Sequence, residues 1–171
     1  IPDLKNRPWL RHDPEIGGML RDLGTHAFAP LIVAGILTAD AEVCRADLAK
    51  LEEDDRTFVS ATTRNDVEMY CSILLREQEI PVQAVFGKVP GEGGIWSLTI
   101  RFRNGMFYGG LRGGQPSVVV LNDGRIASEV MSVYPVEFLI REAQLFFNGK
   151  LPEFDGNTGA ILGSLELCEK I

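Results

Sequence analysis

Long apolar runs are missing from this sequence of 171 residues. The longest, Phe28–Leu37, extends over about ten residues and contains Pro30 and Gly35, whereas a membrane-spanning helix needs about 20 predominantly apolar residues. The run therefore predicts a buried core segment, and we expect no membrane partner. An Asn-x-Ser/Thr glycosylation sequon is also missing.

Cysteine and histidine are scarce and scattered. Cys44, Cys71 and Cys168 form no C-x-x-C pair, the spacing that would indicate a zinc or redox motif. His12 and His26 lie 14 residues apart in different expected elements, so they predict no metal site. We expect free, mostly buried thiols and therefore a reducing compartment, the cytoplasm.

Signatures of cofactor binding and catalysis are missing too. Glycines cluster at residues 91–94 and 109–114, but neither cluster carries the lysine of a P-loop or leads from a strand directly into a helix. Hairpin turns, a β-bulge or a close backbone approach explain these glycines better. We therefore expect no cofactor and no metal, and the absence of a catalytic motif favours a protein without enzymatic activity.

Acidic side chains outnumber basic ones, and most of the excess lies in the first half of the chain. Residues 1–80 carry nine basic and fifteen acidic side chains, whereas residues 81–171 carry eight and nine, which gives a net charge of -7. This balance opposes attraction to phosphate backbones and favours a basic partner. Four consecutive acids, Glu52, Glu53, Asp54 and Asp55, form either a solvated turn or an acidic docking patch.

Helical patterns dominate the first half of the chain. Asp13, Pro14 and Glu15 are typical of a helix start and Gly24 of its end. Apolar residues at helical spacing predict two further helices, over residues 39–53 and 64–78. Those residues are Val43, Ala46, Leu48 and Leu51 in the first helix, and Val67, Tyr70, Cys71, Leu74 and Leu75 in the second.

Strand patterns follow Pro81. Residues 96–103 alternate apolar and polar side chains, and Asn104-Gly105 then predicts a tight turn into a strand that begins at Met106. Further strands are predicted at residues 58–59, 82–86, 118–121, 125–127 and 130–133, with a turn at residues 122–124. Pro135 and Gly149 bound a predicted helix over residues 136–148, and residues 161–168 fit either a strand or a short helix.

These elements predict one α+β domain over residues 1–171. Residues 1–57 would be mainly helical, and residues 58–171 would form a core of helix, β-meander and helix. The central antiparallel meander would have about four to six strands, with N-terminal helices and a C-terminal helix packed on the sheet. In this arrangement the helices at 64–78 and 136–148 close over a sheet made from residues 82–133.

Arginines mark the polar face of the predicted sheet. Arg101 and Arg103 lie on the polar face of the strand at residues 96–103, and Arg112 and Arg125 join them if neighbouring strands pair in register. With Tyr108 nearby, this face can be a solvated surface, a contact for an acidic protein, or a site that grips RNA by phosphate contact and stacking.

The order helix, β-meander, helix over residues 62–153 resembles a family of bacterial immunity proteins, small antitoxins that neutralise polymorphic or contact-delivered toxins. Residues 94–100 running into 104–108 are similar to the paired central strands of that family, and residues 134–152 to its closing helix. The resemblance implies a protein that occludes a toxin's active site and performs no chemistry. A basic nuclease or deaminase toxin would suit the acidic half, with contacts at Glu52, Glu53, Asp54 and Asp55.

Three other classes remain open on the sequence. A nucleic-acid-binding or RNA-sequestering module, viral among others, would use Arg101, Arg103 and Arg112. A small α+β enzyme would need polar groups that converge in a pocket. An acidic secretion chaperone would fit the charge equally well.

Overall fold

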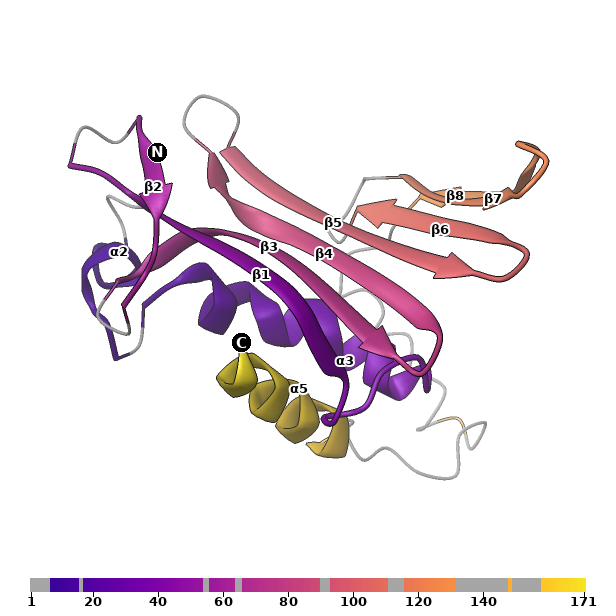
Figure 1. The fold of residues 1–171 in the computed structure, drawn as a ribbon, viewed down its shortest axis with the longest axis horizontal. Coiled ribbons are helices and arrows are strands. Elements are labelled where there is room, and N and C mark those ends of the chain that lie inside the picture. Colours follow the sequence, from indigo (N-terminus) through magenta and orange to yellow (C-terminus); the bar gives the residue numbers. More distant parts are fainter. Residues whose placement is uncertain are drawn as a thin grey trace.

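The fold is two-layered, with helices on one face of a single antiparallel sheet (Figure 1). The computed structural model describes residues 7–15, 17–53, 56–63, 66–89, 93–110, 116–131, 148 and 158–171. The helical elements are α2 (Trp9–His12), the π-helical turn η1 (Leu20–Gly24), α3 (Thr25–Val33) and α5 (Thr158–Lys170). The strands are β1 (Glu42–Leu51), β2 (Phe58–Ser60), β3 (Glu68–Glu77), β4 (Ile80–Val89), β5 (Gly93–Phe102), β6 (Gly105–Gly110), β7 (Pro116–Leu121) and β8 (Ile126–Met131).

The predicted α+β class is confirmed, with a larger sheet than expected. Eight strands lie in the order β2-β1-β3-β4-β5-β6-β7-β8, and each pair of neighbours is antiparallel. From β3 to β8 the sheet is a simple meander. The expected strands at residues 58–59, 82–86, 96–103, 118–121 and 125–127 fall largely in β2, β4, β5, β7 and β8. The predicted β5–β6 hairpin forms, but its two-residue turn is Arg103-Asn104, one residue earlier than predicted, and Gly105 already belongs to β6.

The predicted helix over residues 39–53 is wrong, because this segment is strand β1. The pairing with β3 has two irregularities. The first, between Val43 and Arg45, adds Cys44 to β1, whereas the second, between Ala49 and Lys50, adds Met69 to β3. Because of the extra residue Cys44, Val43, Ala46 and Leu48 lie on one face at spacings of three and two residues, which imitates helical spacing. The prediction that residues 1–57 are mainly helical therefore fails at residues 42–51, which form a strand.

The predicted helix over residues 64–78 is also wrong. Strand β3 lies inside the sheet, and its residues alternate between half-buried and buried along the strand. Met69, Cys71, Ile73 and Leu75 are fully buried on the side of the helices. The expected closure of this segment over the sheet therefore does not occur, and α3 and α5 cover the sheet instead (Figure 1).

The N-terminal helix begins later and ends later than predicted. The chain is helical in α2, turns at Asp13, and is helical again from residue 19 through η1 and α3 to Val33. Gly24 does not end this helix. It is buried, and a Cβ added to it would lie 2.7 Å from Sγ of Cys168, so glycine is needed there for close packing against α5.

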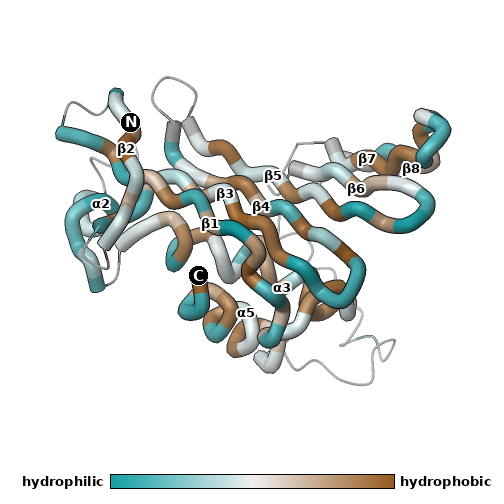
Figure 2. Tube along the Cα trace, in the orientation of Figure 1, coloured by the Kyte–Doolittle hydropathy of each residue, from teal (hydrophilic) through white to brown (hydrophobic). Residues whose placement is uncertain are grey.

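The core fills the space between the helices and strands β3, β4 and β5. Phe28 of α3 meets Phe86 of β4 edge to face, with ring centroids 6.3 Å apart, and Leu167 of α5 is fully buried in the same cluster. Figure 2 shows apolar residues concentrated on β3, β4, α3 and α5. The segment 161–168, undecided from sequence, is therefore helical and supplies the C-terminal helix of the predicted architecture.

Two predicted elements lie outside the described residues, namely the helix over residues 136–148, apart from Asn148, and the end of the last predicted strand at residues 132–133. Among the helices that the structure describes, none is long and apolar enough to cross a lipid bilayer.

Candidate functional site: two charged ends of the sheet

The acidic end of the molecule is formed by α2 and the turn between β1 and β2, which lie side by side (Figure 1). Glu52 and Glu53 are exposed in this turn. The guanidinium of Arg11 donates a hydrogen bond to the backbone oxygen of Glu52 at 2.6 Å, which ties α2 to the turn. Asp54 and Asp55, predicted with these two residues as a docking patch, lie outside the described residues.

An open hollow of about 530 Å³ lies beside this turn. Leu10 is fully buried and anchors α2, whereas its neighbour Trp9 is 39% exposed and forms part of the hollow. The lining consists of aromatic, proline, histidine and acidic side chains: Pro8, Trp9, His12, Asp13, Pro14 and Glu15.

Backbone hydrogen bonds hold the wall of the hollow in place. The carboxylate of Asp13 accepts the N–H of Glu15 at 2.9 Å, which closes a tight turn after α2. Arg21 donates to the backbone oxygens of Pro14 and Glu15. The hollow was not predicted from the sequence. The available signal was a tryptophan preceded by Pro8 and followed closely by Asp13, Pro14 and Glu15.

A lysine on β1 near this turn is neutralised within the protein. Lys50 Nζ lies 2.6 Å from the carboxylate of Asp66, which also accepts the N–H groups of Thr62 and Thr63 at 2.8 and 2.9 Å. These hydrogen bonds, led by that from Lys50, hold the pKa of Asp66 well below its usual range. Lys50 is thus paired mainly with Asp66, and the nearby charge of Glu52 also contributes to raising its pKa.

The basic end of the molecule is formed by the β5–β6 turn and the β7–β8 turn, which lie together at the end of the sheet away from α2 (Figure 1). Asn122, in the β7–β8 turn, donates from its side chain to the backbone oxygen of Arg103 at 2.9 Å. Arg101 and Arg103 are exposed, and Arg125 pairs with Asp123 at 2.7 Å. Across the sheet, Arg101 is in line with Met106, Val120 and Ile126, so the register does not bring Arg125 to Arg101 as predicted. Arg112 lies outside the described residues.

Large apolar side chains accompany the arginines at this end. Phe102 is 43% exposed, Tyr108 47% and Ile126 62%. Arg101 pairs across the sheet with Met106, and Tyr108 lies two residues further along β6, on the same face as Met106. The combination of arginine with exposed aromatic and aliphatic groups is typical of surfaces that bind other macromolecules.

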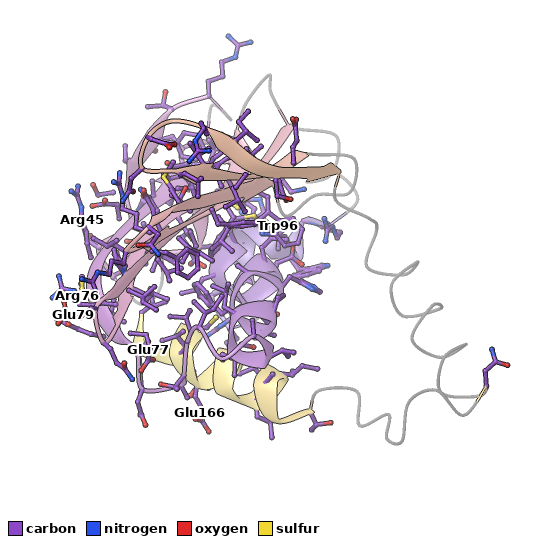
Figure 3. The ribbon with its side chains drawn as sticks, turned by 90° about the vertical axis from the view of Figure 1, so that its right-hand side faces the viewer. Arg45, Arg76, Glu77, Glu79, Trp96 and Glu166 are labelled. Carbon is purple, nitrogen blue, oxygen red and sulfur yellow. The ribbon has the colours of Figure 1, made fainter. Side chains whose placement is uncertain are left out.

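A third group of charges, near the β3–β4 turn, is largely compensated. Arg76 pairs with Glu42 at 3.7 Å, and the Glu77 carboxylate accepts both the N–H and the hydroxyl of Thr38, at 2.9 and 2.8 Å. Figure 3 shows Arg76, Glu77 and Glu79 along one border of the molecule, away from Trp96. These contacts stabilise the sheet border and leave little charge for a partner.

The thiols are poor candidates for nucleophiles. Cys71 and Cys168 are buried, and burial raises the pKa of Cys168 to about 12 and also raises the pKa of Cys71, so both stay protonated at neutral pH.

The ring of His26 meets Trp96 edge-on with centroids 6.0 Å apart. Within the described ranges, no three His, Cys, Asp or Glu side chains are grouped so as to hold a metal ion.

Comparisons of the chain with protein-family models, with curated proteins and with solved structures found no match. The two charged ends are therefore the basis for a functional proposal.

Proposed function

We propose that this chain is a protein-binding domain without enzymatic activity, whose acidic end receives a basic surface of another protein. The observation that carries the proposal is the hollow beside the β1–β2 turn, where the exposed Trp9 lies among acidic side chains. A tryptophan face attracts lysine and arginine side chains, and nearby carboxylates strengthen that attraction.

The position of Trp9 fits a binding hot spot. Tryptophan is enriched among the few residues that dominate protein interfaces, because it contributes a large contact area. The excess of acidic over basic side chains among residues 1–80 would steer a basic partner toward this end and speed encounter. Glu52 and Glu53 would then contact the partner around the tryptophan.

Within this class, the resemblance to immunity proteins leads to a narrower proposal. Since the first helix of that resemblance is strand β3 here, the resemblance is carried by the paired strands at residues 94–108. The partner would be a basic toxin domain, a nuclease or deaminase, whose active site accepts phosphates. The carboxylates of Glu52, Glu53, Asp54 and Asp55 would occupy positions meant for phosphate groups, so that binding excludes the nucleic-acid substrate.

Affinity capture with matched variants tests the proposal. The wild-type chain, the double variant Glu52→Lys/Glu53→Lys, the variant Trp9→Ala and the control Arg101→Glu/Arg103→Glu would each be used on native lysate of the source cells. We expect a basic protein to be retained by wild type and by the control, and to be lost with both acidic-end variants. Circular dichroism would check that all four proteins fold.

Salt dependence adds a second criterion. Retention by wild type should fall as ionic strength rises, because the Debye length shortens from about 10 Å at 0.1 M to about 3 Å at 1 M. Equal retention by wild type and by Glu52→Lys/Glu53→Lys, at low and high salt alike, would contradict the proposal.

The basic end supports a second candidate function, binding of single-stranded RNA. Arg101 and Arg103 are exposed, and no acidic partner of either is found in the described part of the chain. Tyr108 is available for base stacking. Filter binding with a labelled single-stranded RNA would test this candidate, and an absence of salt-sensitive retention would remove it.

A further inference from the structure

The hollow at the acidic end is lined by one short segment of the chain, residues 8–15, which turns at Asp13. This segment brings an exposed indole, two proline rings and two carboxylates together around one space. The volume of about 530 Å³ lies within the range of about 300–1,000 Å³ that is usual for small-ligand sites. The hollow therefore has room for one long side chain of a partner.

Contacts with the body of the protein hold this segment in shape. Leu10 is fully buried. The N–H of Gly17 donates to the backbone oxygen of Asp13 at 2.7 Å, and the next N–H along the chain donates to that of Leu10 at 2.9 Å. A Cβ at Gly17 would lie 2.5 Å from the backbone oxygen of Asp13, so glycine is needed for this close approach. A preformed hollow lowers the entropic cost of binding.

Carboxylates without an ion-pair partner lie in and beside the hollow. Glu15 forms part of its wall, and Glu52 and Glu53 are exposed in the adjoining β1–β2 turn. Among the described residues, none forms a salt bridge with any of these three side chains. A cationic group that enters the hollow would therefore meet opposite charge.

The wall of the hollow already binds one guanidinium through its backbone. Nη1 of Arg21 donates to the backbone oxygen of Pro14 at 3.0 Å and to that of Glu15. These hydrogen bonds use carbonyl groups of the wall. The carboxylate of Glu15 is thus left as an acceptor for a group that comes from outside.

We propose that the hollow receives an arginine side chain of the basic partner. The guanidinium lies against the indole of Trp9 and donates to the carboxylate of Glu15. The methylene groups of the same side chain pack on the rings of Pro8 and Pro14. This inference rests on the proposed function, because it names the group of the partner that enters the hollow.

Arginine fits these surroundings better than lysine does. Its planar guanidinium stacks on an aromatic ring and can donate two hydrogen bonds to one carboxylate. A guanidinium is also more weakly hydrated than an ammonium, so it loses less solvation in a hollow lined by tryptophan and proline. Trp9 and Glu15 would therefore determine the specificity of the site.

Nuclear magnetic resonance of the full isotope-labelled chain tests the proposal with acetylglycyl-arginyl-glycinamide and its lysine and citrulline counterparts as probes. The chain has two tryptophans, and Trp9→Phe assigns their indole N–H signals. We expect the arginine probe to shift the Trp9 signal in a saturable way while that of Trp96, in β5, stays in place. The lysine probe should bind about fivefold more weakly, and the uncharged citrulline probe should not bind. Equal affinities for arginine and lysine, or an unmoved Trp9 signal, would overturn the proposal.

A matched pair of variants tests the carboxylate. Glu15→Gln keeps the size of the side chain and removes its charge, so the arginine probe should bind about tenfold more weakly. Glu79→Gln removes an exposed carboxylate at the β3–β4 turn instead and should bind the probe as wild type does. Equal affinities in the two variants would show that Glu15 does not contact the guanidinium.

The probe and capture experiments can fail separately. Retention of a basic protein that depends on Trp9, together with probes that show no preference for arginine, would contradict this inference alone. A hollow that selects the arginine probe, with no basic protein retained from lysate, would instead contradict the proposed function.

Discussion

Oε1 of Glu68 lies 2.8 Å from the backbone nitrogen of Leu20 and accepts its hydrogen bond. Glu68 begins β3, and Leu20 lies in the first turn of the helical segment that continues through α3. The first N–H groups of a helix have no partner within the helix. A side chain 48 residues further along the chain satisfies one of them here, and so connects the helical layer to the sheet.

Gly18 makes room for this contact, and Gly18→Ala should destabilise the fold. Its φ is +95°, and an added Cβ would lie 2.4 Å from Oε1 of Glu68. The carboxylate can move away only by giving up the Leu20 hydrogen bond. We expect the free energy of unfolding to fall by more than the roughly 1–2 kcal/mol that positive φ alone costs, as measured by urea titration.

Gly35→Ala is the matched control. Gly35 also has positive φ, +67°, but nothing lies within 4 Å of an added Cβ. The difference between the two variants therefore measures the contact with Glu68. Equal losses of stability in Gly18→Ala and Gly35→Ala would show that the carboxylate yields freely and that the Leu20 contact contributes nothing.

The ionisation of Glu68 should make stability fall as pH rises. Burial, acting against the Leu20 hydrogen bond, raises the pKa of Glu68. The folded state therefore holds this proton more tightly than the unfolded state, and the free energy of unfolding decreases between the ordinary and the raised pKa. Glu68→Gln keeps an acceptor oxygen but cannot ionise, so its stability relative to wild type should increase across this window. Urea titrations from about pH 4 to about pH 8 would measure the difference, and parallel curves would contradict the prediction.

The strands of the second half were predictable because their patterns are local. Residues 96–103 alternate without interruption and Asn104-Gly105 indicates a turn, so no long-range information is needed to place the β5–β6 hairpin to within one residue of its turn. The exposure of Arg101 was predictable from the same alternation, which places it on the polar side of the strand.

The strands of the first half were not predictable in the same way. In β3, Tyr70 and Leu74 are half-buried on the face opposite to Cys71 and Leu75, so apolar residues on both faces also match a helical pattern. In β1, the extra residue after Val43 also produces a spacing of three, which matches a helical pattern. The hollow at Trp9 depends on how α2 docks on the β1–β2 turn, which is a contact between distant segments.

Asp66 should make stability fall at acidic pH, the opposite of Glu68. Hydrogen bonds from Lys50, Thr62 and Thr63 lower the pKa of Asp66, so the folded state favours the charged form. The stabilisation is present above the ordinary pKa of aspartate and is lost as pH falls below it. Asp66→Asn should therefore be less stable than wild type at neutral pH, with the difference shrinking on acidification. Asp47→Asn, which removes the exposed pair with Arg45, should change little at either pH.

Gln78→Gly should stabilise the protein. Glu77 pairs with Ile80, so Gln78 and Glu79 form a two-residue turn between β3 and β4, and Gln78 adopts φ of +53°. This conformation costs a residue with a Cβ about 1–2 kcal/mol, whereas glycine adopts it freely at an entropic cost of roughly 0.5–1 kcal/mol. We expect a net gain of up to about 1 kcal/mol in the free energy of unfolding, seen as a higher urea midpoint with an unchanged slope.

Glu79→Gly, at the neighbouring position without positive φ, should lower the midpoint, since there glycine brings only its entropic cost. A lower midpoint for Gln78→Gly as well would show that the glutamine side chain contributes more than its backbone strain removes.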